Sequence, residues 1–382
     1  MSMTWRCLPG KAVCYTAAAI ALLSLFVTSA ASHAAQAPTG NDWPTWRYDA
    51  ARSGNYLGQV PARLRLQWVR QLGAPAPAWL PEQYKLQFDR SYEPVVMGRQ
   101  IFVGSMARDT MTAYDTRTGK ENWRFYCDGP VRLAPVAWQG KLYVASDDGH
   151  LYCLDAERGR LVWKVRLAPS DRMVLGNGRL ISAWPVRGGP VLLSGTVYCT
   201  AGIWPFMGVF IYALDAETGR VVWENSGTGA IYIKQQHSSP AFAGVAPQGY
   251  LAAAQNKLLL TSRTIPACLD ATTGKLLHYN LSDRSYGKYM GGYAASIWKD
   301  WYFNNRVAYR LSDGLALGAM TAQVMAKDQV VLVDGQGELI GCDLAENTKR
   351  DPKSKKLRTE LRASALWKAP NPVALDLSLI HI

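Results

Sequence analysis

One short string recurs along this chain of 382 residues and limits its fold more than any other feature. TAYDTRTGKENW (112–123) returns as YCLDAERGRLVW (152–163), YALDAETGRVVW (212–223) and, more weakly, ACLDATTGKLLH (267–278). The copies align on aspartates that are 40, 60 and 55 residues apart, namely Asp115, Asp155, Asp215 and Asp270. Repeats of this period are typical of propellers.

A single repeat unit reads as four short strands. Between residues 133 and 167 the strand-like runs are LAPVAW, KLYVAS, HLYCLD and RLVWKVRL, with turn residues between them. Four consecutive antiparallel strands joined by tight turns make one propeller blade. The sequence therefore predicts an all-β chain, a β-propeller of four-stranded antiparallel blades.

The recurring residues have mechanical roles in such a blade. The aspartate can accept hydrogen bonds from backbone N–H groups two or three residues ahead. The glycine can adopt a positive φ, and the tryptophan can pack against a neighbouring blade. We interpret the motif as a structural docking device rather than a catalytic one. Its residues are Asp115, Gly119, Trp123, Asp155, Gly159, Trp163, Asp215, Gly219, Trp223, Asp270 and Gly274.

The motif resembles the tryptophan-docking motif of quinoprotein dehydrogenases, A-x-D-x-x-T-G-K-x-x-W. Residues 113–123 match it at every specified position, and residues 213–223 depart only at Arg220. With its weaker copies the resemblance spans residues 60–345 and points to the pyrroloquinoline-quinone-like (PQQ-like) propeller family. That family includes quinone enzymes and non-enzymatic exported members, such as the outer-membrane assembly factor, to which this chain is more similar. DWPTWRYDAARSG (42–54) also resembles the entry segment of exported propellers.

About six blades can be counted, together with a lone fourth strand around Trp68. The last blade is expected to end in SALWKA (364–369), beyond a basic insertion. The resemblance implies seven or eight blades in a complete chain. We therefore expect an entry segment at 35–59, a truncated propeller at 60–376, and possible non-native sequence at 377–382.

Residues 1–34 have the three-part pattern of a secretory signal peptide. Arg6 and Lys11 precede an apolar run at 12–28, which small residues follow. The alternative is an uncleaved membrane anchor, for which the run is short compared with a span of ~20 residues. We expect a periplasmic or secreted protein with no transmembrane span after removal of the signal.

The net charge of +13 invites a nucleic-acid partner, but its distribution argues against one. The segment 347–362 holds seven Lys and Arg residues against two acidic ones, and we interpret it as a solvated basic loop. After the signal peptide five cysteines remain, without a CxxC spacing. Cys153 and Cys268 are expected to be small buried residues, and one disulfide among the five is left open.

Candidate ligand-binding residues come from loops that share the face of a propeller at the mouth of its channel. Several arginines converging there could bind a carboxylate or a phosphate. The alternative, which we favour, is that they pair with carboxylates of the same loops. The candidates are Glu93, Arg108, Arg132, Asp147, Arg187, His237 and Arg263.

The resemblance implies, for the family's enzymes, PQQ positioned by calcium, usually with Glu, Asn and Asp ligands, an Asp base and in many cases a disulfide between adjacent cysteines. This chain has no adjacent cysteine pair. Glu93 and Asp147 fit no calcium-ligand spacing. We therefore predict no catalytic residue, no metal ligand and no cofactor, and PQQ with calcium belongs to the alternative interpretation.

Two further features allow more than one interpretation. His237 stands beside serines and could act as a general base, but no G-x-S-x-G elbow accompanies it, so a hydrogen-bonded residue at a strand entry is favoured. GIWPFMG (202–208) predicts either a lip that contacts a partner or a lid packed on the propeller.

Together these features indicate an exported, monomeric propeller that acts as a non-catalytic binding or scaffold module in the cell envelope. Its expected partner is an envelope protein or a small anionic ligand, and no nucleic acid. The alternative is a PQQ-dependent alcohol or sugar dehydrogenase. A lyase- or hydrolase-like propeller that uses the channel mouth is a third, weaker hypothesis.

Overall fold

The computed structural model describes residues 42–370, apart from 62, 84, 177, 235–238, 282–290, 335, 351–354 and 356. The chain divides into two compact units, Met1–Gln36 and Ala37–Ile382, and every described residue belongs to the second. The expected signal peptide, the possible non-native end and His237 lie outside the described residues. None of the helices in the described part is long and apolar enough to cross a membrane.

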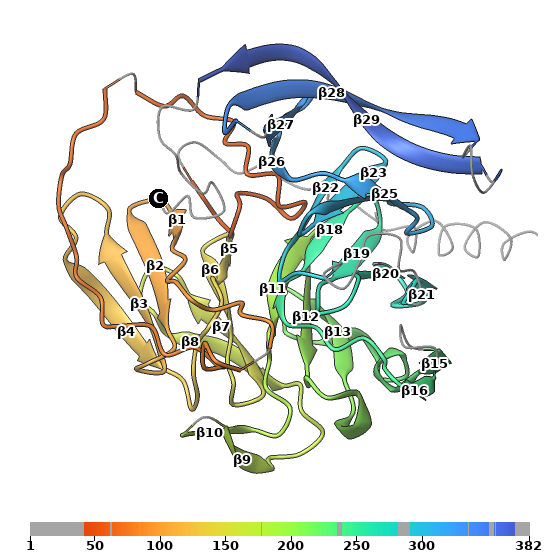
Figure 1. Ribbon diagram of the computed structural model, residues 1–382. Helices are drawn as coiled ribbons and strands as arrows, with labels where there is room; N and C mark the ends of the chain where they lie inside the picture. Colours follow the sequence, from red (N-terminus) through yellow and green to blue (C-terminus); the bar gives the residue numbers. More distant parts are fainter. Residues whose placement is uncertain are drawn as a thin grey trace, which may run out of the picture. The chain divides into compact units, whose positions relative to one another are not determined.

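Six sheets, each with four antiparallel strands of the blade type, follow one another along the described part of the second unit (Figure 1), and the third has a fifth strand, Gly249–Tyr250, added in parallel. In each sheet the strands are hydrogen-bonded in sequence order, as the blades of a propeller require. The predicted all-β propeller of four-stranded antiparallel blades is confirmed, and six sheets match the number of units counted in the sequence.

The first three sheets are formed as follows: β1 Val95–Met97, β2 Gln100–Ser105, β3 Thr110–Asp115 and β4 Glu121–Tyr126; β5 Val136–Trp138, β6 Lys141–Ala145, β7 His150–Asp155 and β8 Leu161–Arg166; β11 Gly188–Leu193, β12 Thr196–Ala201, β13 Phe210–Asp215 and β14 Val221–Asn225. The strand β17, Gly249–Tyr250, pairs in parallel with β11.

The last three sheets are formed as follows: β18 Ala252–Ala254, β19 Lys257–Leu260, β20 Ala267–Asp270 and β21 Leu276–His278; β22 Ala295–Trp298, β23 Trp301–Asn304, β24 Val307–Arg310 and β25 Ala316–Ala319; β26 Ala322–Met325, β27 Val330–Val333, β28 Leu339–Arg350 and β29 Leu357–Ala369. Two hairpins lie between sheets, β9 Met173–Gly176 with β10 Arg179–Ser182, and β15 Tyr232–Lys234 with β16 Pro240–Phe242. Two single-turn 3₁₀ helices are η1 Pro205–Met207 and η2 Thr228–Ala230.

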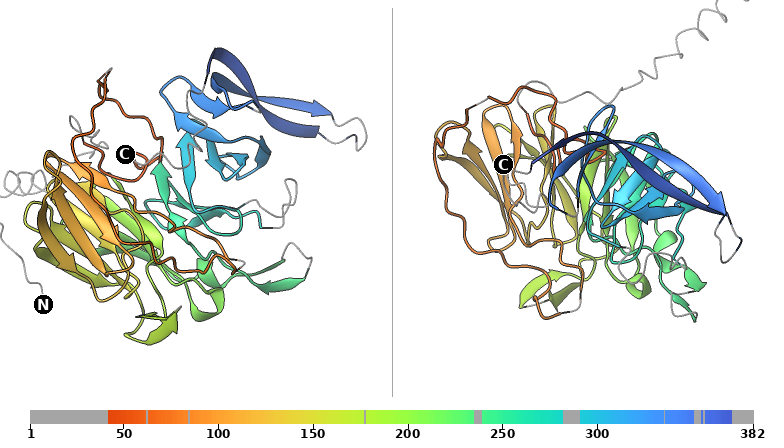
Figure 2. Two further views of the ribbon diagram at one scale, coloured as in Figure 1. Left: turned by 60° about the vertical axis from the view of Figure 1, so that its left-hand side comes forward. Right: turned by 45° about the horizontal axis from the view of Figure 1, so that its top comes forward.

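The first strands of successive sheets lie against one another and form the hub. The contacts run from β1 to β5, from β5 to β11, from β11 to β18, from β18 to β22 and from β22 to β26. Figure 2 shows the sheets turned about this hub from two further directions. Each sheet therefore presents its first strand to the centre and its fourth strand to the outside.

Residues 43–53 of the expected entry segment cross the hub, and we call this stretch the hub segment. It exchanges backbone hydrogen bonds with five of the six first strands: Trp43 with Val96, Pro44 with Ala137, Ala50 with Ala253, Ala51 with Ile297, and Ser53 with Met325. The remaining first strand, β11, accepts a hydrogen bond from the Arg52 side chain at Pro190. One short segment thus ties all six described sheets together.

Arg52 is the anchor of the hub segment and is fully buried. Its guanidinium donates to the backbone oxygens of Leu251 at 2.8 Å and Trp46 at 2.9 Å, as well as to Pro190. The cation also lies 5.5 Å from the ring centre of Tyr250, which stacks on Trp46. Burial lowers the pKa of Arg52 to about 10, so the side chain stays charged at neutral pH.

Indole rings of the fourth strands bridge neighbouring sheets. Trp123 of the first sheet donates from Nε1 to the backbone oxygen of Ala156 at 3.0 Å, in the motif turn of the second sheet. Its ring lies so close to Gly159 that a Cβ there would be 2.5 Å from the ring. The same arrangement joins Trp163 to Gly219 and Trp223 to Gly274. Each glycine has a positive φ, so it combines a left-handed turn with a close approach.

The motif aspartates close these turns. Asp115 accepts hydrogen bonds from the backbone N–H groups of Arg117 and Thr118 at 3.0 and 2.9 Å. Asp155, Asp215 and Asp270 each accept the N–H of the residue three positions ahead. The turn geometry therefore places each glycine where the preceding sheet's indole arrives.

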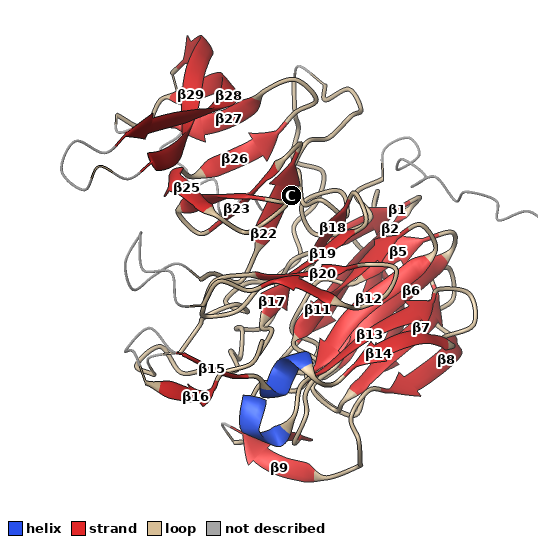
Figure 3. Ribbon diagram, turned by 90° about the vertical axis from the view of Figure 1, so that its right-hand side faces the viewer, coloured by secondary structure: helices blue, strands red, loops and turns tan. Residues whose placement is uncertain are grey.

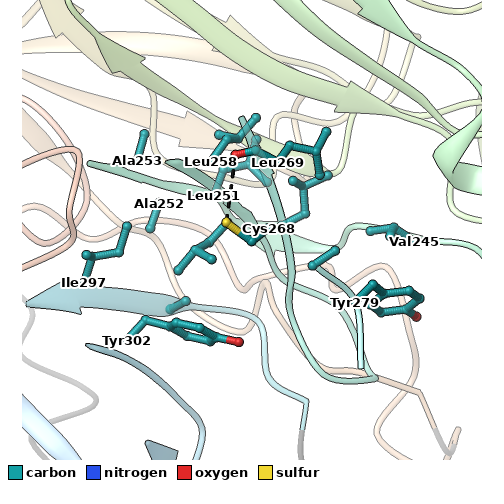
Figure 4. Close-up of a cluster of buried hydrophobic side chains, with 14 of the residues drawn as sticks. Val245, Leu251, Ala252, Ala253, Leu258, Cys268, Leu269, Tyr279, Ile297 and Tyr302 are labelled. Carbon is teal, nitrogen blue, oxygen red and sulfur yellow. Dashed lines mark hydrogen bonds between the residues drawn. The ribbon is translucent and has the colours of Figure 1, made fainter. Parts of the chain in front are cut away.

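Apolar clusters fill the spaces between sheets. Figure 4 shows the cluster that joins the third, fourth and fifth sheets, in which Leu258, Cys268, Ile297 and Tyr302 are each at most 4% exposed. Cys268 is one of five buried cysteines that form no disulfide among the described residues. Cys153 is another, so both have the small buried role that the sequence suggests.

The sixth sheet corrects one expectation. In the basic segment 347–362, residues 347–350 and 357–362 are strand rather than loop, because β28 runs on to Arg350 and β29 starts at Leu357 (Figure 3). The register pairs Leu344 with Ala363, and both Leu344 and Leu361 are buried against the fifth sheet's aromatic residues. Within the described part of the basic segment only Leu361 is buried, and its other residues are exposed or partly exposed. The predicted strand SALWKA is confirmed as part of β29.

The lone strand expected around Trp68 belongs to no sheet among the described residues. Its indole nevertheless repeats the contact of the other tryptophans. Trp68 Nε1 donates to the backbone oxygen of Thr116 at 2.9 Å, and its ring lies against Gly119. The motif turn of the first sheet is therefore occupied in the same way as the turns of the second, third and fourth sheets.

Candidate functional site

The loops at the channel mouth hold a buried network of two arginines and two aspartates. Arg132 precedes β5, Arg187 precedes β11, and Asp147 follows β6. Arg132 donates from Nε to Asp147 at 2.5 Å and from Nη1 to Asp89 at 2.8 Å. Arg187 donates to both oxygens of Asp147, at 3.0 and 2.8 Å. All four residues are at most 7% exposed.

The two cations and two carboxylates of this network neutralise each other. Burial works against ionisation of Asp147, yet the charges and hydrogen bonds of Arg132 and Arg187 lower its pKa. Asp89 has the Arg132 guanidinium and the Ala78 N–H as partners, but burial outweighs them and raises its pKa. The network therefore joins four connecting segments to one another, and these arginines pair with carboxylates as the favoured interpretation held.

A second group lies beside the hub segment. The Tyr250 hydroxyl donates to Glu93 and accepts the backbone N–H of Ala134 at 2.7 Å. Burial raises the pKa of Glu93 to about 8, although the Tyr250 hydrogen bond and the charge of Arg52 favour ionisation. Glu93 is thus connected to the anchor of the hub rather than exposed for a ligand.

The remaining sequence candidates lie elsewhere. Arg108 is exposed on the β2–β3 loop and lines a different pocket. Arg263 is exposed on the β19–β20 loop. The structure therefore does not bring all of the described candidates together at one mouth. Arg132, Asp147 and Arg187 meet, and Glu93 lies near them.

Several residues of the mouth were missed from the sequence. Asp89 completes the network although it precedes the first sheet, and Trp79 covers Arg187 with its ring centre 5.4 Å from the guanidinium. Trp79 also donates to Gln248 at 2.9 Å and makes an edge contact with Trp204. The stretch 74–93 contains no copy of the repeat motif. Its high content of aromatic and charged residues was the one sequence signal for a place in the mouth.

The loop 202–208 is packed on the mouth like the predicted lid, and the predicted contact with a partner stays a prediction. Trp204 lies against Trp79, and the backbone oxygen of Met207 accepts the Trp184 Nε1–H at 2.6 Å, so the loop is packed on the mouth. Phe206, however, is 76% exposed. The same loop thus closes part of the mouth and presents an apolar side chain to solvent.

The donor set does not fit a calcium-bound quinone. Calcium takes six to eight oxygen ligands, including carboxylates that are free to coordinate. Within the described residues no group of three or more His, Cys, Asp or Glu side chains is arranged to hold a metal. At the mouth, Asp147 and Asp89 already accept hydrogen bonds from arginine, and Glu93 accepts one from Tyr250.

The repeated sheets, the hub and the turn motif define a propeller of the PQQ-like class. Comparison with known families goes one step further. The chain belongs to the family described as "Outer membrane protein assembly factor BamB", whose model matches residues 46–350.

Curated relatives include enzymes. Quinohemoprotein alcohol dehydrogenase of Comamonas testosteroni is 30% identical over 238 residues, which are 56% of this chain and 32% of that protein. The dehydrogenase subunit of alcohol dehydrogenase (quinone) of Gluconobacter oxydans is 34% identical over 160 residues, or 38% of this chain and 20% of that protein. The chain thus spans a third or less of the length of these relatives.

Solved structures of similar fold include BamB from Moraxella catarrhalis, with a TM-score of 0.42 and 16% identity over 72% of this chain and 71% of that chain. Europium-containing methanol dehydrogenase has a TM-score of 0.48 and 12% identity over 86% of this chain and 78% of that chain.

Proposed function

We propose that this protein is an exported, monomeric propeller that acts as a non-catalytic binding or scaffold module in the cell envelope, periplasmic or secreted. The observation that carries the proposal is the network of buried ion pairs at the mouth. Arg132 and Arg187 form ion pairs with Asp89 and Asp147, so these charges hold loops in place instead of facing a substrate. Membership in a family described as an outer membrane assembly factor supports the same role.

A partner would meet exposed apolar side chains around the mouth. Phe206 stands on the loop packed against Trp79, and η1 of this loop contacts η2. Tyr232 and Phe242 of the β15–β16 hairpin are 64% and 62% exposed and contact each other edge to face. Exposed aromatic side chains of this kind are enriched at protein–protein interfaces. We therefore assign the expected envelope protein to these elements.

The scaffold proposal is tested by photocrosslinking from position 206 in intact envelopes, followed by a binding measurement with the purified partner. Phe206→Ser should weaken that binding by about tenfold or more, the effect of losing one buried aromatic anchor. Val222→Ser, which changes an exposed apolar residue of β14, is the matched control. Equal effects of the two substitutions would contradict an interface at the mouth.

The second candidate, a PQQ-dependent alcohol or sugar dehydrogenase, is favoured by relatives that are 30–34% identical and are quinone-dependent alcohol dehydrogenases. The full chain would be incubated with PQQ and calcium and tested for dye reduction with alcohols and sugars. Quinone absorbance that stays with the protein, together with turnover, would replace the scaffold proposal. Absence of both would leave the scaffold role as the better supported function.

A further inference from the structure

One face of the first sheet carries a polar pocket that lies away from the mouth network. The pocket has a volume of about 90 Å³ and lies between β2, β3 and β4 and the chain around residues 70–73. Three of its lining side chains are arginines, Arg70, Arg108 and Arg124, and the lining contains no carboxylate. Met111 and Ala113 point to the opposite face, where they pack in the cluster shared with the second sheet.

Thr112, which lines the pocket, stands where the next two sheets carry tyrosine. In the strand registers Thr112 pairs with Val103 and Arg124. Tyr152 has the same position in the second sheet, and Tyr212 in the third. Both tyrosines are buried, and their side chains are larger than that of the threonine in the first sheet.

The cations around this space are not neutralised in the way those at the mouth are. Among the described residues Arg108 has no ion pair, and the Arg70 guanidinium lies 5.1 Å from the ring centre of Tyr114. Arg124 does have an anionic partner, because it donates to Glu121 at 2.5 Å. The pocket therefore keeps an excess of positive charge.

Hydroxyl groups complete the lining. Ser105 Oγ accepts the backbone N–H of Arg108 at 3.2 Å, which leaves its own proton free to donate. Thr110 and Thr112 are buried in the same pocket. Guanidinium groups and hydroxyls that surround a small space are the donors that an oxyanion needs.

We propose that this pocket binds a small oxyanion, a carboxylate or a phosphate group, between Arg70, Arg108 and the hydroxyls of Ser105 and Thr112. The site lies outside the exposed aromatic residues assigned to the partner, so it goes beyond the scaffold role and does not depend on it. The pocket admits a small group or the end of a larger molecule, because its volume is only about 90 Å³.

The test is isothermal titration of the full chain with inorganic phosphate and, separately, with acetate. Heat of binding with either probe is expected, and the better probe identifies the anion class. The double variant Arg70→Gln/Arg108→Gln should weaken binding by about tenfold or more. Arg99→Gln is the matched control, because Arg99 is an exposed arginine of the same sheet that pairs with Asp115 outside the pocket.

A second variant tests the shape of the site without removing charge. Thr112→Tyr places in the pocket the ring that the second and third sheets already accommodate, and binding should be lost while circular dichroism stays unchanged. If that variant fails to fold, the arginine variants decide alone. Absence of binding with both probes, an equal loss in Arg99→Gln, or full binding in the double arginine variant would each overturn the proposal.

Discussion

The contact between Trp163 and Gly219 allows the cohesion of two sheets to be measured. Trp163 is partly buried and donates from Nε1 to the backbone oxygen of Glu217 at 3.2 Å. Burial of roughly 100 Å² of indole at ~25 cal/mol/Å² gives ~2.5 kcal/mol, and the hydrogen bond adds ~1 kcal/mol. We expect Trp163→Ala to lower the free energy of unfolding by ~3–4 kcal/mol.

Gly219→Ala should be costly for two separate reasons. Gly219 has a φ of 71°, and a Cβ at this position would lie 2.8 Å from the Trp163 ring. The left-handed backbone costs ~1–2 kcal/mol for alanine, and displacement of the ring adds ~1 kcal/mol or more. In a chain that already carries Trp163→Ala only the backbone cost remains, so the two substitutions should couple by ~1 kcal/mol or more.

Urea unfolding followed by circular dichroism measures this cycle. Gly195→Ala is the matched control, because Gly195 belongs to the same sheet and has a φ of 76°, but nothing lies within 4 Å of its added Cβ. It should show the backbone cost without coupling to Trp163→Ala. Additive effects for Gly219→Ala, or equal coupling for both glycines, would refute the idea that the indole holds the next sheet through its glycine.

Three further predictions concern the buried charges. Asp147→Asn removes the charge that faces two buried arginines and should lower the free energy of unfolding by ~3–5 kcal/mol, measured by thermal or urea unfolding. The control Asp171→Asn, at an exposed ion pair, should lower it by less than ~1 kcal/mol. Similar losses in the two variants would contradict the network. Glu93, whose pKa is raised from 4.5 to about 8, contributes stability that is present below about pH 4.5 and lost as the pH rises through about 8. Glu93→Gln should abolish ~1–3 kcal/mol of this pH dependence in unfolding curves, and an unchanged pH profile would speak against a buried carboxyl. Arg52→Met should lower the free energy of unfolding by ~3 kcal/mol or more, because several buried carbonyls lose their donor, and a neutral effect would remove Arg52 from its role as the anchor of the hub segment.

The repeated part of the fold could be predicted from the sequence because the residues that form the strands and turns of each unit are close together in the sequence. The turn at Asp155 and Gly159 is set by residues that are neighbours in sequence, and the same string recurs in other units. Period and turn chemistry are local signals, so strands, turns and sheet order followed from them. Burial of Cys153 and Cys268 followed from the strand pattern as well.

The site depended on contacts that no local signal encodes. Asp89 meets Arg132 across 43 positions and from a stretch without a repeat, so its pairing arises only once the sheets have packed. Arg108 was grouped with the mouth by its position in a loop, but its side chain lines the pocket on the face of the first sheet. Aligning the repeats sets Thr112 against Tyr152 and Tyr212, but a smaller residue at one strand position does not by itself indicate a pocket.

The hub segment has a consequence for how the chain acquires its structure. It is made before any sheet, but its backbone partners extend from Val96 to Met325. Such separations give a high contact order, which slows folding, because the loops must close before the contacts form. The hub segment can therefore complete its set of backbone partners only after the sixth sheet, which supplies Met325, has been made.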